Sequence, residues 1–159
     1  MRVAVLMGAR SAEREVSLKS GQAVCEALKA RGYEVVPIDA GRDVAQQLTA
    51  AKVDVVFNAL HGKYGEDGTV QGLLEIRGRP YTGSGVLASA VAMDKITTKR
   101  LLLAESLPTP RFCVFSRSLP GEEPWDAYRQ DVVTRIGLPA VVKPATQGST
   151  IGVTFAHTE

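Results

Sequence analysis

The chain has 159 residues and a formal net charge of +2, and 45% of its residues are hydrophobic and 23% charged. This balance is typical of a soluble globular protein and excludes the concentrated basic stripe that nucleic-acid binding needs. The apolar run at residues 3–7 is too short to span a membrane, and no cleavage region accompanies it. The two cysteines, Cys25 and Cys113, are too few for a disulfide framework and predict small core side chains in a reducing cytoplasm.

Strand and helix patterns alternate over residues 1–94, which predicts βαβ units and a Rossmann-like parallel sheet with helices on both faces. The predicted strands are residues 3–7, 34–38, 53–58 and 80–82. The first predicted helix ends at Gly32, and its apolar side carries Val16, Ser20, Val24, Ala27 and Leu28. A second helix is predicted at residues 43–50, with Asp43 as its N-cap. Two more are predicted at residues 69–76 and directly after residues 83–85. Right-handed crossovers place the loops 8–11, 59–68 and 83–85 at the carboxyl edge of the sheet, where ligands bind.

The pattern changes near residue 95, where we expect a boundary between domains 1–94 and 95–159. The predicted elements of the second region are a helix at 95–105, a strand at 111–115, a helix at 122–136 and strands at 140–143 and 151–155. No helical pattern closes this region. We therefore expect an incomplete α+β domain with an uncovered apolar face near Val153 and Phe155.

Two loops of the first region carry candidate ligand-binding residues. The loop after the first strand brings Glu13 to the first turn of a helix, where a carboxylate is stabilised by the helix dipole and can bind an ammonium group. Taken alone, Glu13 is better explained as balancing that dipole. The loop at residues 59–68 follows His61 with three glycines, Gly62, Gly65 and Gly68, which let backbone N–H groups approach a ligand. His61 is equally compatible with contacting a substrate and with merely capping the loop.

Lysines suggest a phosphate site in the second region. Lys143 ends a predicted strand beside the small-residue loop 144–150, and a point charge next to backbone donors suits a phosphate group. Lys95 lies at the predicted hinge, where a ligand could bridge two domains. A solvated lysine is the ordinary alternative for each of them, and no P-loop motif is present.

Taken together, these motifs resemble those of the D-alanine–D-alanine ligases of the ATP-grasp superfamily. The matching stretches are residues 11–18 (SAEREVSL), 59–62 (ALHG) with 65–68 (GEDG), 81–85 (YTGSG), 93–95 (MDK), and 142–144 (VKP) with 148–149 (GS). They occur in the family's order from one end of the chain to the other. The resemblance implies a pre-ATP-grasp domain followed by part of an ATP-grasp central domain.

The resemblance also assigns roles to residues. Glu13 matches the glutamate that holds the amino group of the first D-alanine, Ser149 a serine hydrogen-bonded in that glutamate's network, and His61 a histidine near the first substrate. Lys95 and Lys143 match lysines that contact ATP phosphates. The implied reaction joins two D-alanines through an acyl phosphate, with ATP and Mg²⁺ or Mn²⁺ as cofactors, for peptidoglycan precursors. The resemblance further implies a cytoplasmic homodimer.

Two departures from the family pattern matter. Ala9 stands where the family usually has a second glycine, and we expect the turn to survive unless this residue needs positive φ. The family continues for about the same length again, with its adenine pocket and metal ligands there. We therefore place the metal ligands beyond residue 159, assign none within this chain, and expect the 159 residues alone to have no ligase activity.

Two alternatives stay open on the sequence. The chain could belong to another ATP-grasp carboxylate–amine ligase, which would share the fold and the phosphate-binding lysines but not the Glu13 and His61 loops. It could instead be a truncated, non-catalytic module that associates through the exposed edge of its last strands.

Overall fold

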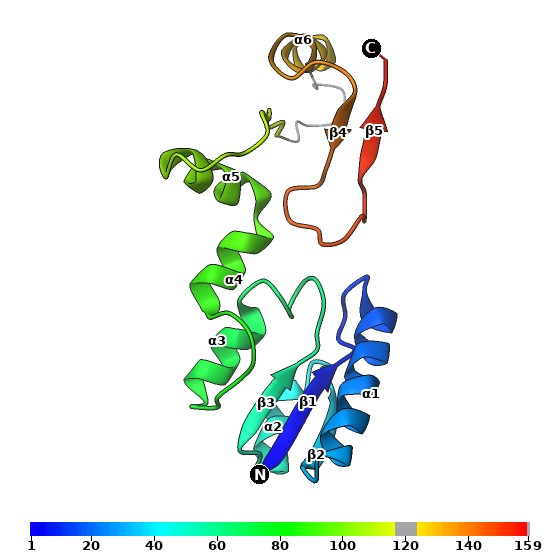
Figure 1. Cartoon of the computed structure of the whole chain (residues 1–159), viewed down its shortest axis with the longest axis vertical. Coiled ribbons are helices and arrows are strands. Elements are labelled where there is room, and N and C mark those ends of the chain that lie inside the picture. The colour runs from blue at the N-terminus through cyan, green and yellow to red at the C-terminus, as the bar shows by residue number, and fades with distance from the viewer. Residues whose placement is uncertain (117–123, 159) are drawn as a thin grey trace. The chain divides into compact units, whose positions relative to one another are not determined.

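The computed structural model describes residues 1–116 and 124–158, which fall into two compact units, Met1–Met93 and Asp94–Glu159. Figure 1 shows the helices and strands of both units. None of the helices in the described ranges is long and apolar enough to cross a membrane.

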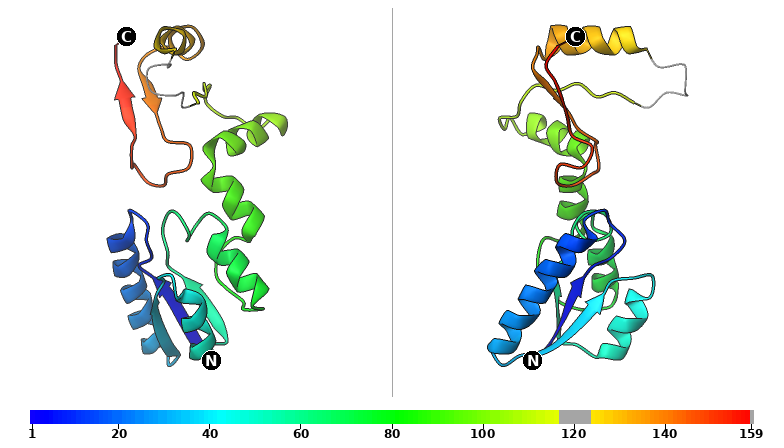
Figure 2. Two further views of the ribbon diagram at one scale, coloured as in Figure 1. Left: turned by 180° about the vertical axis from the view of Figure 1, so that it is seen from behind. Right: turned by 90° about the vertical axis from the view of Figure 1, so that its right-hand side faces the viewer.

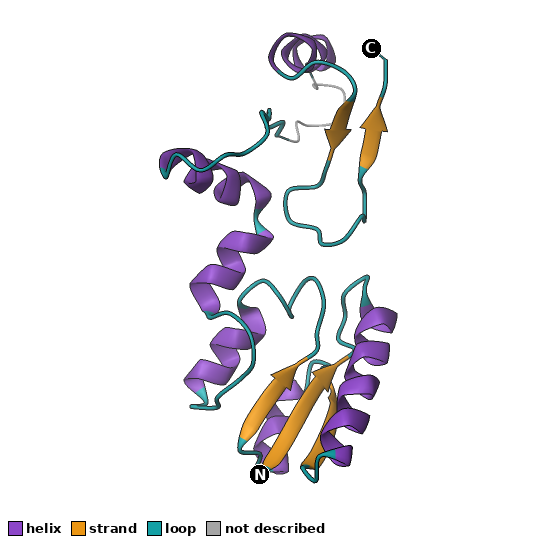
Figure 3. Ribbon diagram, in the orientation of Figure 1, coloured by secondary structure: helices purple, strands orange, loops and turns teal. Residues whose placement is uncertain are grey.

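A three-stranded parallel sheet forms the centre of the first unit (Figure 3). Its strands are β1 (Arg2–Met7), β2 (Glu34–Asp39) and β3 (Val55–Asn58), in the order β2-β1-β3. The predicted strand at 80–82 is reduced to a single parallel bridge between Val56 and Tyr81. The central strand is almost entirely buried, as its continuous apolar sequence predicts.

Helices cover both faces of this sheet (Figure 2). Helix α1 (Arg14–Ala30) covers one face, α2 (Val44–Ala51) and α3 (Thr69–Ile76) cover the other, and α4 (Val86–Met93) packs against α3. Successive side chains of a strand point to opposite faces. Leu6 therefore packs with residues of α2 and α3, whereas Val5 and Met7 pack with Cys25 of α1. The predicted fold class of this region is confirmed, and so is the prediction of Cys25 as a core residue.

The buried face of α1 agrees only in part with the predicted one, because Val24 and Leu28 pack against the core as expected but other residues do not. Val16 is 54% exposed, whereas Ser17, Gly21 and Cys25 are buried. These three residues follow one another at four-residue spacing and therefore lie on one face. A Cβ added at Gly21 would overlap Met7 of β1. The helix thus lies so close to the sheet that small residues form its contact face, which a search for large apolar residues does not detect.

The second unit is an α+β arrangement with much less burial. Its elements are α5 (Lys95–Ala104), α6 (Trp125–Arg135), β4 (Ala140–Val142) and β5 (Thr154–Ala156). Strands β4 and β5 pair antiparallel, from Ala140 opposite Ala156 to Val142 opposite Thr154. The exposed side chain of Phe155 agrees with the uncovered apolar face that the sequence predicts.

Several predicted elements need correction. The strand predicted at 111–115 is wrong, because this segment has no ladder partner among the described residues; Lys99 Nζ instead donates to the Pro110 carbonyl just before it. Cys113 therefore lies in an irregular segment. The strand predicted at 151–155 begins only at Thr154, after a turn. The first residues of the helix predicted at 122–136 lie outside the described residues.

The predicted Asp43 cap is also wrong in detail. Asp43 occupies the N-cap position of α2, but its side chain makes no capping hydrogen bond. Its carboxylate instead accepts a hydrogen bond from Gln47 Nε2 at 3.0 Å.

Candidate functional site

The predicted loops do lie at the carboxyl edge of the first unit's sheet, and a cavity opens between the loops 59–68 and 83–85, whereas residues 8–11 do not line it. Its volume is about 470 Å³. Its lining includes Ser20 of α1, residues after β3 such as His61 and Glu66, Thr82 from the segment that leads into α4, and Ser89 of α4 itself. A helix, a strand exit and a third segment therefore contribute to one site, as expected for a parallel α/β sheet.

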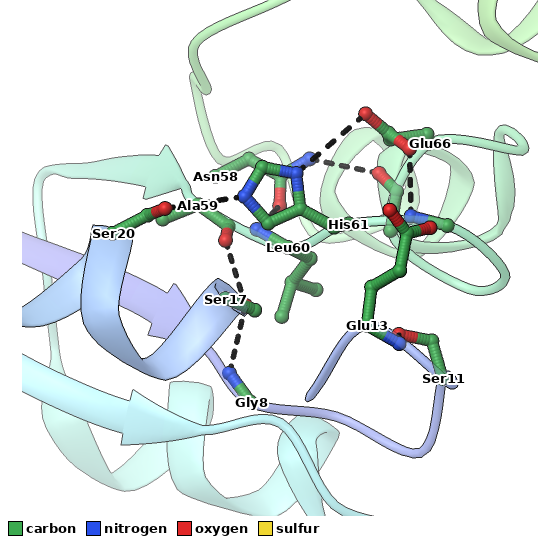
Figure 4. A network of polar contacts seen from close by, with 12 residues as sticks. Gly8, Ser11, Glu13, Ser17, Ser20, Asn58, Ala59, Leu60, His61 and Glu66 are labelled. Atoms are coloured by element: carbon green, nitrogen blue, oxygen red, sulfur yellow. Dashed lines mark hydrogen bonds and ion pairs between the residues drawn. The ribbon is translucent and has the colours of Figure 1, made fainter. Parts of the chain in front are cut away.

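Glu13 lies at the N-cap of α1, just before the helical turn in which the sequence analysis placed it. Its backbone N–H donates to Ser11 Oγ at 3.1 Å, and its side chain makes no capping bond. The carboxylate reaches toward the loop after β3 (Figure 4). A Cβ added at Gly62 would lie 2.7 Å from Glu13 Oε2. Gly62 also has a φ of +66°, a left-handed conformation that favours glycine.

The oxygens of the Glu13 carboxylate are available to accept hydrogen bonds from a ligand. The carboxylate makes no hydrogen bond or ion pair with any residue in the described ranges. The position of Glu13 at the N-cap is compatible with balancing the helix dipole, which is the simpler explanation, and the absence of a capping hydrogen bond leaves its oxygens available to a ligand. Glu13 does not line the cavity, but a carboxylate held beside the glycine loop that borders it is suited to accept hydrogen bonds from an ammonium group.

His61 connects two other polar side chains of the cavity wall. Its Nε2 lies 3.3 Å from Ser20 Oγ, and its Nδ1 lies 3.9 Å from Glu66 Oε1 (Figure 4). The other oxygen of Glu66 accepts the Gly62 N–H at 2.6 Å. The ring is thus oriented from both sides.

The rest of the His61 loop is fixed by its own polar groups. Asp67 accepts hydrogen bonds from the N–H groups of Tyr64 at 3.0 Å and Thr69 at 3.1 Å. Partial burial raises the pKa of Asp67, but these hydrogen bonds outweigh it and the pKa lies below its usual value. The Gly65 carbonyl accepts from both Asn58 Nδ2 and Gln71 Nε2 at 2.9 Å. A loop held this way keeps its shape without a ligand.

The first residue of α1 and the last residue of β2 form an ion pair that the sequence patterns did not predict. Arg14 binds Asp39 through two hydrogen bonds of 2.7 and 2.6 Å and also donates to the Ala9 carbonyl. The hydrogen bonds from Arg14 hold the pKa of Asp39 below its usual value, and those to Asp39 raise the pKa of Arg14. Asp39 ends β2 at the same edge of the sheet at which Arg14 begins α1. The predicted parallel topology could therefore have indicated that the two side chains lie close together.

Ala9, which stands where the family usually has a second glycine, has a φ of +64°. This is the positive φ at which the replacement of glycine by alanine matters. The left-handed conformation is strained for alanine by roughly 1–2 kcal/mol. The methyl group is nevertheless buried in the core beside Leu6 and Leu60.

The second unit gathers its candidate residues around the loop 144–150. Lys95 begins α5, and its backbone N–H donates to the Ala145 carbonyl at 3.0 Å. Its Nζ donates to the Gln147 carbonyl at 2.6 Å. Lys143 follows β4 directly, and Ser149 is exposed with a φ of +53°. Glu13 and His61 belong to the first unit and Ser149 to the second, so their shared cleft stays a prediction.

Among the residues that the structure describes, no group of three or more His, Cys, Asp or Glu side chains could hold a metal ion.

Solved structures identify the class of protein that has this arrangement. The D-alanine–D-alanine ligase of Bacillus anthracis matches with a TM-score of 0.78 and 38% identity, over 100% of this chain and 50% of that one. Its complex with ATP matches with a TM-score of 0.72 and 36% identity, over 100% and 51%. The fold is therefore that of a ligase of the ATP-grasp class.

Sequence comparisons identify the family. The family model described as D-ala D-ala ligase N-terminus matches residues 2–49 and 39–84, and the one described as D-ala D-ala ligase C-terminus matches residues 101–159. The chain belongs to the D-alanine–D-alanine ligase family, which confirms the resemblance.

Curated relatives set the extent of the match. The D-alanine–D-alanine ligase of Pelotomaculum thermopropionicum is 54% identical over 159 residues, which are 100% of this chain and 50% of the relative. That of Desulforudis audaxviator is 57% identical over 158 residues, 99% of this chain and 50% of the relative. The chain spans about half the length of the curated relatives it matches.

Proposed function

We propose that these 159 residues provide the D-alanine-side half of an ATP-dependent D-alanine–D-alanine ligase. In the proposed reaction, the carboxylate of one D-alanine takes the γ-phosphoryl group of ATP and ADP leaves. The amine nitrogen of a second D-alanine then attacks the acyl carbon, loses a proton, and displaces phosphate. The dipeptide would serve peptidoglycan precursor synthesis in the cytoplasm.

The observation that carries this proposal is the approach of the Glu13 carboxylate to Gly62. It brings an acceptor that lacks a hydrogen bond to any described residue to the loop that holds His61. We assign Glu13 to the ammonium group of the first D-alanine, because charge-assisted hydrogen bonds are the strongest available to such a small ligand. An ammonium held there fixes the orientation of the carboxylate that accepts phosphate.

His61 is proposed to border the first substrate. Ser20 and Glu66 hold its ring from both sides at the cavity wall. These contacts on both ring nitrogens give the ring one orientation toward the bound amino acid. Ser149 is proposed to join the hydrogen-bonded network of Glu13 from the other unit.

Lys95 and Lys143 are proposed to contact ATP phosphates. They flank the loop 144–150, to which Lys95 is fixed by backbone and side-chain bonds. Lysine ammonium groups offset the negative charge on phosphoryl oxygens during transfer. Mg²⁺ or Mn²⁺ would add to this charge stabilisation when bound, and we expect its ligands in the part of the ligases that these residues do not cover.

A chimera tests the proposed function. Residues 1–159 replace the matching half of the Pelotomaculum thermopropionicum ligase, and phosphate release is measured with ATP and D-alanine. We expect D-alanine-dependent release. Glu13→Gln should lower kcat/KM for D-alanine about ten- to hundredfold, because one charge-assisted interaction is lost.

Glu15→Gln provides the matched control. Glu15 is an exposed acid of the first turn of α1, two residues from Glu13, and it should leave kcat/KM unchanged. A folded chimera without D-alanine-dependent release, or equal kinetics for Glu13→Gln and Glu15→Gln, would contradict the proposal. Release stimulated equally by other amino acids would favour the alternative of another carboxylate–amine ligase.

Association is a second candidate function with one supporting observation. Val141, Val142 and Phe155 of the β4–β5 pair are 49%, 53% and 62% exposed. We propose a homodimer for the ligase on the basis of the family resemblance. Light scattering of the 159-residue chain tests whether it associates through this apolar surface. Association that Phe155→Ser abolishes would support this role, and a monomeric chain would count against it.

A further inference from the structure

Ser17 joins the exits of two strands inside the first unit. Its side chain lies in the first turn of α1 and is completely buried. The Oγ atom accepts the Gly8 N–H at 2.9 Å and donates to the Ala59 carbonyl at 2.7 Å (Figure 4). Gly8 follows β1 and Ala59 follows β3, so one hydroxyl group connects a helix to two strand ends.

The Ser17 hydroxyl group replaces one backbone hydrogen bond between β1 and β3. The register of β1 and β3 ends with Leu6 opposite Asn58, and the Ala59 N–H still donates to the Leu6 carbonyl at 2.9 Å. In a parallel ladder the next bond runs from the Gly8 N–H to the Ala59 carbonyl. Here both of these groups bond to the Ser17 hydroxyl instead. The inserted side chain therefore ends the ladder and separates the two strands at this point.

The two candidate loops diverge directly after this separation. Gly8, with a φ of +76°, begins the turn that leads to Glu13, and Ala59 leads through Leu60 to His61. The backbone of Ser17 also donates to the Glu13 carbonyl at 3.0 Å. Ser17 thus contacts the main chain at the start of both loops, although its own side chain is buried below the cavity edge.

We propose that Ser17 is a positioning residue whose hydroxyl group sets the separation between the Glu13 and His61 loops, and thereby the geometry of D-alanine binding. This inference rests on the proposed function. Without the hydroxyl group, the Gly8 N–H and Ala59 carbonyl either stay buried without partners or bond directly. The first outcome destabilises the loop bases, because unpaired buried groups are costly. The second draws the loops together.

Kinetics of the chimera described above test the positioning role. Ser17→Ala should raise KM for D-alanine about tenfold, with a smaller change in kcat and an unchanged KM for ATP. Ser17→Thr, which restores the hydroxyl group, should recover most of the D-alanine KM. Cys25→Ala is the matched control, since Cys25 is buried two turns further along the same face of α1 and away from both loops. It should lower stability without changing the D-alanine KM.

Equal D-alanine KM values for Ser17→Ala, Cys25→Ala and the parent chimera would overturn the inference. The proposed function would survive that result if Glu13→Gln still lowered D-alanine turnover.

NMR of the 159-residue chain tests the geometry without catalysis. In Ser17→Ala, the Gly8 amide should exchange with solvent at least about tenfold faster, or show a direct through-bond coupling to the Ala59 carbonyl. The backbone signals of Glu13 and His61 should shift in either case. Unchanged signals at both residues would overturn the inference even if the chimera were inactive.

Discussion

The two units of this chain differ most in how much apolar surface they bury. In the first unit, continuous clusters on both faces of the sheet include fully buried residues such as Leu6 and Leu74. In the second unit, Ala140 is the one buried apolar side chain among the described residues, and Leu103, Trp125 and Phe155 are exposed. The first unit therefore has the driving force to hold its loops in place, because burial dominates stability.

This difference bears on where the candidate site is preorganised. The loops with Glu13 and His61 begin at buried strand ends, and backbone N–H groups and amide side chains fix the His61 loop. The loop 144–150 lies in the exposed second unit and is held by hydrogen bonds from Lys95. We expect substrate specificity to reside mainly in the well-packed first unit, since precise geometry needs rigid support.

Truncating one apolar side chain in each unit gives the largest expected contrast. Leu6→Ala removes a fully buried side chain of β1 and should destabilise the chain by about 2–5 kcal/mol. Phe155→Ala removes an exposed side chain and should cost less than about 1 kcal/mol. Urea unfolding followed by circular dichroism measures both. Equal losses would show that the second unit has a comparable core.

Alanine at two glycines gives the next contrast. Gly21→Ala would gain helix propensity, but its Cβ would overlap Met7, so we expect a net loss of about 1–3 kcal/mol. Gly137, in the second unit, has open space around it and a φ of +86°. Gly137→Ala should cost only about 1 kcal/mol of backbone strain. Thermal unfolding compares the two, and a stabilising Gly21→Ala would contradict the close approach of α1.

Acid should weaken the His61 loop through Asp67. The folded pKa of Asp67 lies below its unfolded value, so its contribution is fully present above about pH 4 and is lost as the pH falls through the folded pKa. Because solvent screens this partly exposed group, the effect should stay below about 1 kcal/mol. Urea midpoints between pH 2 and 6 should decline more in the parent than in Asp67→Asn. Parallel curves would rule out this contribution.

Ala9→Gly should have the smallest effect. Relief of left-handed strain, about 1–2 kcal/mol, opposes the loss of a buried methyl group, about 1 kcal/mol, and the greater chain entropy of glycine. We expect a net change within about 1 kcal/mol by chemical denaturation. A loss above about 2 kcal/mol would mean that packing of the methyl group dominates.

Sequence patterns predicted the first unit better than the second for a physical reason. The strand at 3–7 and the helix at 69–76 were found because their local sequence and their burial agree. The segment 111–115 has the composition of a strand but no ladder partner among the described residues, and partners are set by tertiary structure. The pairing of Arg14 with Asp39 and the bridge through Ser17 connect positions far apart in sequence, so local patterns do not contain them.

Within the site, the identity of Glu13 and His61 came from motif resemblance. Their geometry could not be predicted from the motifs. The approach of Glu13 to Gly62 depends on the left-handed conformation of Gly62 and on the position of Glu13 at the N-cap, one residue before the first turn of α1.

Binding of D-alanine compared with propionate tests the central claim most directly. Propionate keeps the methyl group and carboxylate of D-alanine but lacks the ammonium group assigned to Glu13. Calorimetric titration of the chimera should show weaker binding of propionate by about ten- to hundredfold, and Glu13→Gln should abolish this preference. Equal affinities for the two ligands, or a preference that persists in Glu13→Gln, would contradict the account.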